Sequence, residues 1–250
     1  MTFAGFFLLV SALAPRLAMC EVVEQFMEIQ DRSDKGSPIQ IAGHMTLGYD
    51  KTNQFPFSYQ ESLSIKNVST KAILLMVVQF DATSGPARDE KFSQEYFFGD
   101  ALGPGQVEAH DFPAQRYGTP LVNGEPVPYQ PDLHPTAEAH AEFVQFGDGS
   151  TWGDADAATN VLGLRQKTLA ELDLLEHLYE QRGESAFLEE LAKADGLLSV
   201  IYQLKRRCEN KPAYVNCTYE SVHQTLATAR EHEAALNAAR TISADVYPAD

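Results

Sequence analysis

The chain has 250 residues, with 35 acidic against 19 basic side chains and a formal net charge of −16 at pH 7. At roughly 100 to 200 residues per domain, this length corresponds to one large domain or two small ones. An apolar share of 44% with 10% aromatic residues is typical of a folded protein and argues against general disorder. Because the acid excess repels phosphate backbones, we do not expect a nucleic-acid partner.

The first twenty residues have the features of a secretory signal peptide. Phe3–Ala14 is an almost unbroken apolar run, shorter than the roughly 20 residues that cross a bilayer. Ala18 and Cys20 stand where a signal peptidase prefers small residues, third and first before the cut. We therefore predict a signal peptide at residues 1–20, export to the periplasm or the extracellular space, and a mature chain without a transmembrane span.

The three cysteines leave alternatives open. Leu17–Cys20 resembles the lipobox of bacterial lipoproteins, and in that alternative Cys20 keeps a covalent lipid anchor. In either exported form Cys208 and Cys217 remain, and an oxidising compartment favours a disulfide between them. If the apolar run instead belongs to the N-terminus of a cytosolic protein, the same two cysteines are free thiols at helix ends.

Residues 21–150 have the pattern of an antiparallel β-sandwich. Apolar and polar residues alternate between Ile39 and Tyr49 with the period of a half-buried strand. Ala72–Phe80 is apolar on both faces except at Gln79, which predicts a central strand. Turn residues separate the segments, and no helical pattern lies between them, which favours a sandwich or a barrel. The predicted strands cover 22–30, 39–49, 59–65, 72–80, 96–98, 106–112 and 137–146.

A proline-rich loop interrupts this region at 113–135, where six of the 13 prolines fall. Proline cannot donate to a sheet ladder, so we predict a surface excursion, with a small hairpin at Asn123-Gly124. Long loops are often functional, which makes Tyr117, Asn123 and Tyr129 candidate binding residues, together with His134 and His140 nearby. The alternative is a stiff cover over a sheet edge.

Residues 151–242 are predicted to form about three helices, followed by a tail at 243–250. A capping-box spacing at Thr151–Asp154 precedes an apolar stripe that ends at Gly183. A second stripe runs from Phe187 to Leu204, and a third helix starts near Asn216. Because the connections between the predicted helices are short, we expect the first two to form a helical hairpin and the third to pack back against them. The expected fold class is therefore α+β, a sandwich followed by helices.

One neighbourhood combines histidines with acids: Asp132, His134, Glu138, His140 and Glu142. On a strand the last three share a face, but the two glutamates are then about 13 Å apart at the backbone, too far for all three to bind one ion. His134 with His140, or His140 with one glutamate, stays possible if the proline-rich loop folds back. The solvated strand face is the favoured interpretation, and we expect no metal and no cofactor.

Other polar segments have structural explanations beside their functional ones. The turn at 147–156 is rich in oxygens that suit calcium, but it lacks the order of an EF-hand loop, and a helix cap with an anchoring Trp152 explains it. The bases at 205–207 are either a docking site or a helix end. Sequons at Asn67 and Asn216 are either glycan acceptors or turn and cap residues.

A resemblance rests on Lys66–Phe80, KNVSTKAILLMVVQF, in which an Asn-x-Ser bend precedes a lysine and a long apolar strand, and on the Pro-Gly turn at Gly103–Gly105. This combination resembles the strand pairs of immunoglobulin-like or fibronectin-type sandwiches in exported bacterial proteins of unknown function. The resemblance covers about 75 residues. The Cys-Trp-Cys signature of true immunoglobulin domains is missing from them. It implies a β-sandwich and carries over no functional residue.

These observations predict an exported, non-enzymatic binding or interaction module of the cell envelope. Its partner is expected to be an unknown protein or envelope component. The sequence contains no Walker loop, dinucleotide fingerprint, His-Glu-x-x-His or Cys-x-x-Cys motif, which lowers the expectation of an enzyme. The alternative is a metal-dependent or other hydrolase that uses the His134–Glu142 neighbourhood.

Overall fold

The computed structural model describes residues 22–50, 55–82, 90–116, 121–122, 125–126, 136–193 and 199–246. The predicted signal peptide at 1–20, with the lipid-anchor candidate Cys20, lies outside the described residues, as do the candidates Tyr117, Asn123, Tyr129 and His134. Among the helices in these ranges, none is both long and apolar enough to cross a membrane.

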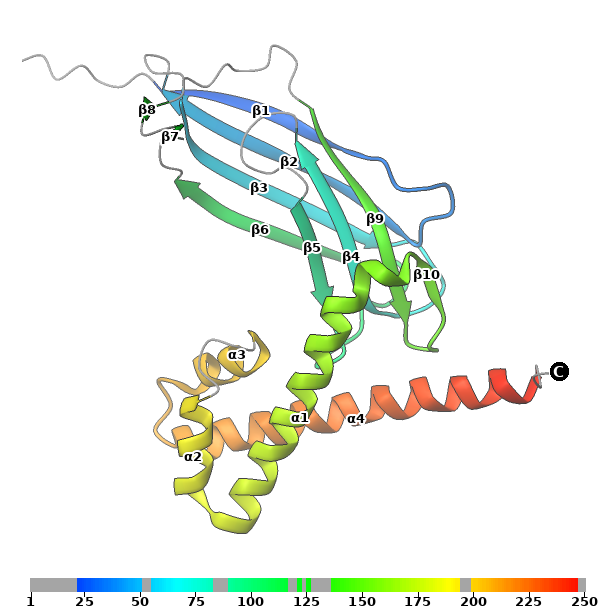
Figure 1. The fold of residues 1–250 in the computed structure, drawn as a ribbon, viewed down its shortest axis with the longest axis vertical. Helices are drawn as coiled ribbons and strands as arrows, with labels where there is room; N and C mark the ends of the chain where they lie inside the picture. Colours follow the sequence, from blue (N-terminus) through cyan, green and yellow to red (C-terminus); the bar gives the residue numbers. More distant parts are fainter. Residues whose placement is uncertain are drawn as a thin grey trace, which may run out of the picture.

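In the described ranges, ten strands precede a helical region (Figure 1). The strands are β1 (Val22–Asp31), β2 (Ile39–Asp50), β3 (Phe55–Asn67), β4 (Ile73–Ala82), β5 (Glu90–Glu95), β6 (Val107–Arg116), β7 (Leu121–Val122), β8 (Glu125–Pro126), β9 (Ala137–Phe146) and β10 (Thr151–Gly153). The helices are the short 3-10 turn η1 (Ala155–Ala158), then α1 (Thr159–Arg182), α2 (Glu184–Lys193), α3 (Ser199–Cys208) and α4 (Tyr214–Val246).

The predicted antiparallel β-sandwich is wrong, because the main strands form one curled, mixed sheet. Their order is β5-β4-β9-β1-β2-β3-β6, with β10 added to β9, in a single eight-stranded sheet. The end of β1 and the start of β9 pair in parallel, Ile29–Asp31 against Ala137–Ala139, and join the two halves into a half-barrel (Figure 1). Alternation in sequence predicts which side chains face a core, but it does not distinguish two stacked sheets from one sheet that curls on itself.

The concave face of the sheet holds the larger core. Alternate residues of β1 to β4 and of β9 contribute to it, including Met27, Met45, Leu63 and Phe80, each at most 3% exposed. The edge strands β5 and β6 meet across the open side through side chains: the Phe92 ring centroid lies 4.8 Å from that of His110. Side-chain packing thus covers the opening of the half-barrel.

Strand β4 is buried along eight consecutive positions, Ile73–Phe80, which confirms the predicted central strand. Met76 and Val78 face the concave core, whereas Val77 packs with Phe143 of β9 against η1 on the outer face. The predicted strand at 96–98 is wrong: β5 ends at Glu95 and the aromatic run follows it in a turn. Burial under helices, not strand pairing, explains this aromatic run, since Phe97 lies in the helical core.

Two further predictions of local structure are confirmed. The pair β7 and β8 is a hairpin around residues 123–124, with Val122 opposite Glu125. Gly183 follows the last residue of α1 at φ 79°, a left-handed conformation that suits glycine.

The helical region has four helices, not about three. The predicted second helix is divided into α2 and α3, and the cap lies at Asp154, whose side chain accepts a hydrogen bond from the Asp156 amide at the start of η1. The helices share an apolar core that also contains Leu74 of β4 and Phe97 from the turn after β5. Sheet and helices therefore pack against each other through a common core, and the predicted domain boundaries stay a prediction.

Candidate functional site

The histidine and the glutamates of β9, for which a solvated strand face was the favoured interpretation, form ion pairs in the structure. Glu138, His140 and Glu142 do share a half-buried face, as expected. Arg32 Nη2 lies 3.0 Å from Glu138 Oε1, and Lys91 Nζ lies 2.7 Å from Glu142 Oε2. In the described part of the chain, no group of three or more His, Cys, Asp or Glu side chains is placed to hold a metal ion. No observation on these residues favours the hydrolase alternative.

The oxygen-rich turn at 147–156 is held by local bonds. Asp148 binds Lys71 Nζ at 2.7 Å and accepts a hydrogen bond from the Ser150 amide. Hydrogen bonds from Lys71 and Ser150 lower the pKa of Asp148 to about 2. Trp152 is partly buried against the concave core, which agrees with its expected anchoring role.

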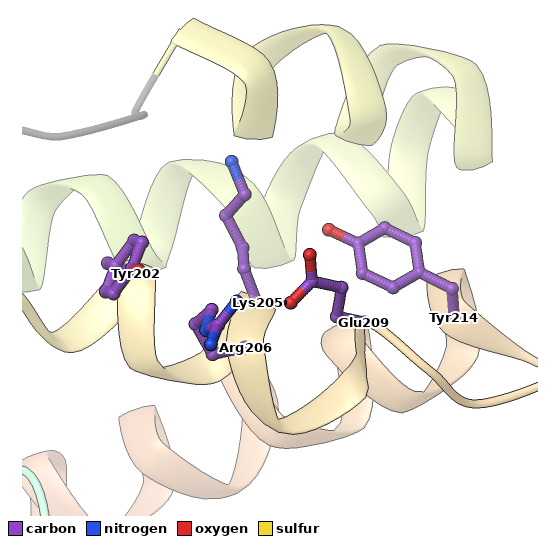
Figure 2. Close-up of a pocket in the computed structure, with 5 residues that line it drawn as sticks. All are labelled: Tyr202, Lys205, Arg206, Glu209 and Tyr214. Carbon is purple, nitrogen blue, oxygen red and sulfur yellow. Dashed lines mark hydrogen bonds and ion pairs between the residues drawn. The ribbon is translucent and has the colours of Figure 1, made fainter. Parts of the chain in front are cut away.

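The bases at the end of α3 border a shallow pocket of about 510 Å³ (Figure 2). Lys205 is directed toward α2, where its Nζ lies 3.4 Å from the Leu191 carbonyl oxygen. Arg206 forms an ion pair with Glu209 at 2.8 Å. All three bases lie in the last turn of α3, where cations offset the negative end of the helix dipole, as the helix-end interpretation expects.

The predicted disulfide is present in the structure. Cys208, the last residue of α3, is bonded to Cys217 in the first turn of α4, with their Cα atoms 5.7 Å apart. Cys208 is fully buried in the helical region. The bond ties the two helices together across the short turn between them.

The most promising site is a cleft between the sheet and the helices, which we call the junction cleft. It has a volume of about 440 Å³ and is bounded by β5 and the turn after it, by the start of β6, and by α1, α3 and α4. Its wall includes apolar and charged side chains, among them Tyr96, Phe98, Asp100, Glu108, Leu164 and Arg207.

One wall of the junction cleft is held by a buried arginine. Arg165 of α1 is 4% exposed and donates two hydrogen bonds to Glu95, from Nε at 2.9 Å and from Nη2 at 3.0 Å. Its Nη1 donates to Gln145 of β9 at 2.7 Å, and its guanidinium lies 4.4 Å from the Phe97 ring centroid. Burial raises the pKa of Glu95, and the hydrogen bonds and charge of Arg165 oppose that rise. The guanidinium therefore fixes α1 on the sheet edge.

A second buried group lies where β5 approaches β6. The Tyr96 hydroxyl donates a hydrogen bond to Glu108. Burial, reinforced by the Glu108 carboxylate, raises the pKa of Tyr96, so the hydroxyl stays protonated. His110 lies just beyond, with Nε2 3.6 Å from Glu108 Oε1 and without a hydrogen-bond partner in the ranges that the structure describes.

The mouth of the junction cleft carries charges that are not engaged. Asp100, in the turn after β5, and Arg207, near the end of α3, are both exposed. Within the described part of the chain, neither side chain forms a hydrogen bond or an ion pair. These two side chains are therefore available to a ligand in the cleft.

Sequence analysis did not find this site, because its residues come from five separate elements and match no motif. One signal was present: Arg165 and Glu176 are buried on the same face of α1 as Leu169 and Leu172, at helical spacing. A charged residue on an apolar helix face is unusual and indicates a buried partner. The partner Glu95 could not be identified from sequence.

Comparisons with known proteins found no matching family model, no matching curated protein and no matching solved structure.

Proposed function

We propose that this protein is an exported, non-enzymatic binding module and that the junction cleft holds its ligand. The observation that carries the proposal is one cleft of about 440 Å³ with a mixed, mainly polar lining, in which the unengaged charges of Asp100 and Arg207 lie beside an apolar part that includes Phe98 and Leu164. Ligand sites of proteins typically measure about 300 to 1,000 Å³, and their polar groups orient the ligand.

The cleft is also preorganised. Arg165 holds α1 to Glu95 and Gln145, and the Tyr96 hydroxyl bonds Glu108, so several residues along the wall are fixed before a ligand arrives. A site that is already ordered loses less conformational entropy on binding. The ligand is a small compound, or an exposed group of an envelope component, that places an apolar part against Phe98 and Leu164.

Support for export comes from the Cys208–Cys217 disulfide. Disulfides persist in oxidising compartments and are rare in the cytosol. The expected signal peptide at residues 1–20 would deliver the chain to such a compartment.

The test compares two tryptophan substitutions on the same helix. Leu164→Trp places a large ring in the junction cleft, whereas Leu174→Trp places the same ring on α1 outside it. The two leucines are matched in exposure, at 43% and 40%. Wild-type protein and both variants are incubated with a small-molecule extract of the cells that produce the protein and are then re-isolated. Compounds released on denaturation are identified by mass spectrometry.

The proposal predicts at least one compound that is retained by the wild type and by Leu174→Trp but lost from Leu164→Trp. If all three proteins retain the same compounds, or none retains any, the junction cleft is not the binding site.

A further inference from the structure

The two sequons differ in how the fold uses their asparagines. Asn67 is fully buried at the end of β3, and Asn216 is exposed in the first turn of α4. N-linked glycosylation replaces one hydrogen on the side-chain amide nitrogen with a bulky sugar, so the surroundings of Nδ2 determine whether a modified chain can reach this fold.

The amide nitrogen of Asn67 has no room for a sugar. Its two hydrogens are donated to the carbonyl oxygens of Lys71 and Leu102, each at 2.8 Å. Its Oδ1 accepts from both the amide and the hydroxyl of Ser69, at 3.0 and 2.7 Å. The Asn-x-Ser sequon is thus a closed turn between β3 and β4, and a glycan on Asn67 would remove one of these two hydrogen bonds and place a sugar in the protein interior.

The side-chain amide nitrogen of Asn216 is free to carry a sugar. Asn216 Oδ1 accepts a hydrogen bond from the Tyr179 hydroxyl at 2.9 Å, and Nδ2 has no hydrogen-bond partner in the described ranges. A sugar on Nδ2 leaves this contact intact and points into solvent. Thr218 is fully buried in folded α4, where its hydroxyl donates to the Tyr214 carbonyl oxygen, so the sequon must be modified before the helix forms.

We infer that Asn216 is an N-glycan attachment site in a host that glycosylates exported chains, and that Asn67 is not. This inference rests on the export part of the proposed function. In the reaction, Asn216 Nδ2 bonds to the anomeric carbon of a polyprenyl pyrophosphate-linked oligosaccharide. The bond from that carbon to the pyrophosphate oxygen breaks, the lipid pyrophosphate leaves with the electron pair, and the amide loses one proton to a base.

Asn216 lies at the outer end of the helical region. Its partner Tyr179 lies in the last turn of α1, at the end of that helix away from the sheet (Figure 1). The glycan would therefore cover the outer end of the helical region.

The test is expression of the full chain in a eukaryotic secretory host. Peptide-N-glycosidase digestion in heavy-oxygen water converts each glycosylated asparagine to a labelled aspartate, which mass spectrometry locates. The expected result is a label on Asn216 and none on Asn67. Asn216→Gln should abolish the gel shift without changing the melting temperature, whereas Ser69→Ala, which removes the other sequon, should leave the gel shift unchanged.

A glycan on Asn67 in folded, secreted protein, or an unmodified Asn216 in protein that has entered the secretory pathway, overturns the inference. A second version carries the host's secretion signal in place of residues 1–20, and chains retained in the cell are analysed in the same way. If only this version is glycosylated on Asn216, the predicted signal peptide fails and the inference stands. If both versions enter the secretory pathway without a label on Asn216, the inference fails independently of export.

Discussion

Replacing Arg165 by methionine tests how the helices are attached to the sheet. Methionine is close to arginine in length and apolar, so it keeps much of the packing against Phe97 but removes the guanidinium. The three hydrogen bonds that Arg165 donates to Glu95 and Gln145 are lost. Glu95, whose side chain is 18% exposed, is left as a carboxylate without its counter-ion.

Breaking a buried ion pair from one side typically costs about 3 to 5 kcal/mol, because the remaining charge is desolvated without compensation. In a protein of this size each kcal/mol lowers the melting temperature by roughly 2 to 4 °C. We therefore expect Arg165→Met to lower the melting temperature by about 6 to 20 °C. The control Arg206→Met removes an ion pair whose side chains are 62% and 54% exposed. It should change stability by less than about 1 kcal/mol.

The pH dependence of the stability lost in Arg165→Met shows whether the unpaired charge of Glu95 causes the loss. The pKa of Glu95 is raised by burial, so folding favours its protonated form, and this contribution to stability is present at low pH and is lost as the pH rises through the raised pKa. Removal of Arg165 takes away the charge that opposes the rise, and the pKa of Glu95 goes up further. The stability difference between Arg165→Met and the wild type should therefore grow from pH 4 to pH 7.

Urea unfolding followed by circular dichroism at several pH values measures this difference. A loss of unfolding free energy below about 1 kcal/mol at pH 7 would refute the claim that Arg165 fixes α1 on the sheet edge. A loss of the same size at every pH would show that packing, not the charge of Glu95, is responsible.

Three further predictions concern stability. Replacing both Cys208 and Cys217 by serine should lower the free energy of unfolding by about 2 to 3 kcal/mol in urea, and an unchanged midpoint would contradict this. Gly153 has φ 86°, and a Cβ there would lie 2.0 Å from a β9 carbonyl oxygen. Gly153→Ala should therefore cost at least the roughly 1 to 3 kcal/mol of backbone strain, measured by thermal unfolding; no loss would show that the turn adapts. Folding lowers the pKa of Asp148 to about 2, so the stability that this carboxylate contributes is lost as the pH falls from the usual aspartate pKa toward 2. Lys71→Met should raise the pKa of Asp148 in an NMR titration, and an unchanged pKa would rule out this ion pair.

Local structure followed from sequence wherever neighbouring residues decide it. Alternation between Ile39 and Tyr49 predicted β2, and the continuous apolar run predicted β4 as a central strand. Asn123-Gly124 predicted the β7–β8 hairpin, and Gly183 predicted the end of α1. In each case side-chain periodicity or a glycine conformation carries the information within a few residues.

Long-range arrangement did not follow from sequence. The parallel contact between β1 and β9 joins residues more than 100 positions apart, and this contact turns two expected sheets into one. The aromatic run Tyr96–Phe98 has strand propensity, but Phe97 is buried among helices instead. The division of the second predicted helix into α2 and α3 was also missed, although Gly196, a residue of low helix propensity, stands between them in the sequence.

The candidate site was even harder to predict from sequence than the arrangement of the strands. His140 was singled out for its acidic neighbours, but the structure pairs those glutamates with Arg32, just after β1, and with Lys91 of β5. The junction cleft depends on how α1 and α3 pack beside β5, and none of its residues belongs to a motif. Tertiary packing, which sequence patterns do not encode locally, creates this site.

The most direct measurement of the central claim is a crystal structure of the protein isolated from the exported fraction of its own cells. The proposed function predicts a bound compound in the junction cleft, with its apolar part against Leu164 and a polar group near Arg207 or Asp100. A cleft that contains only water, in a protein that carries its compound elsewhere or carries none, would contradict the proposed function.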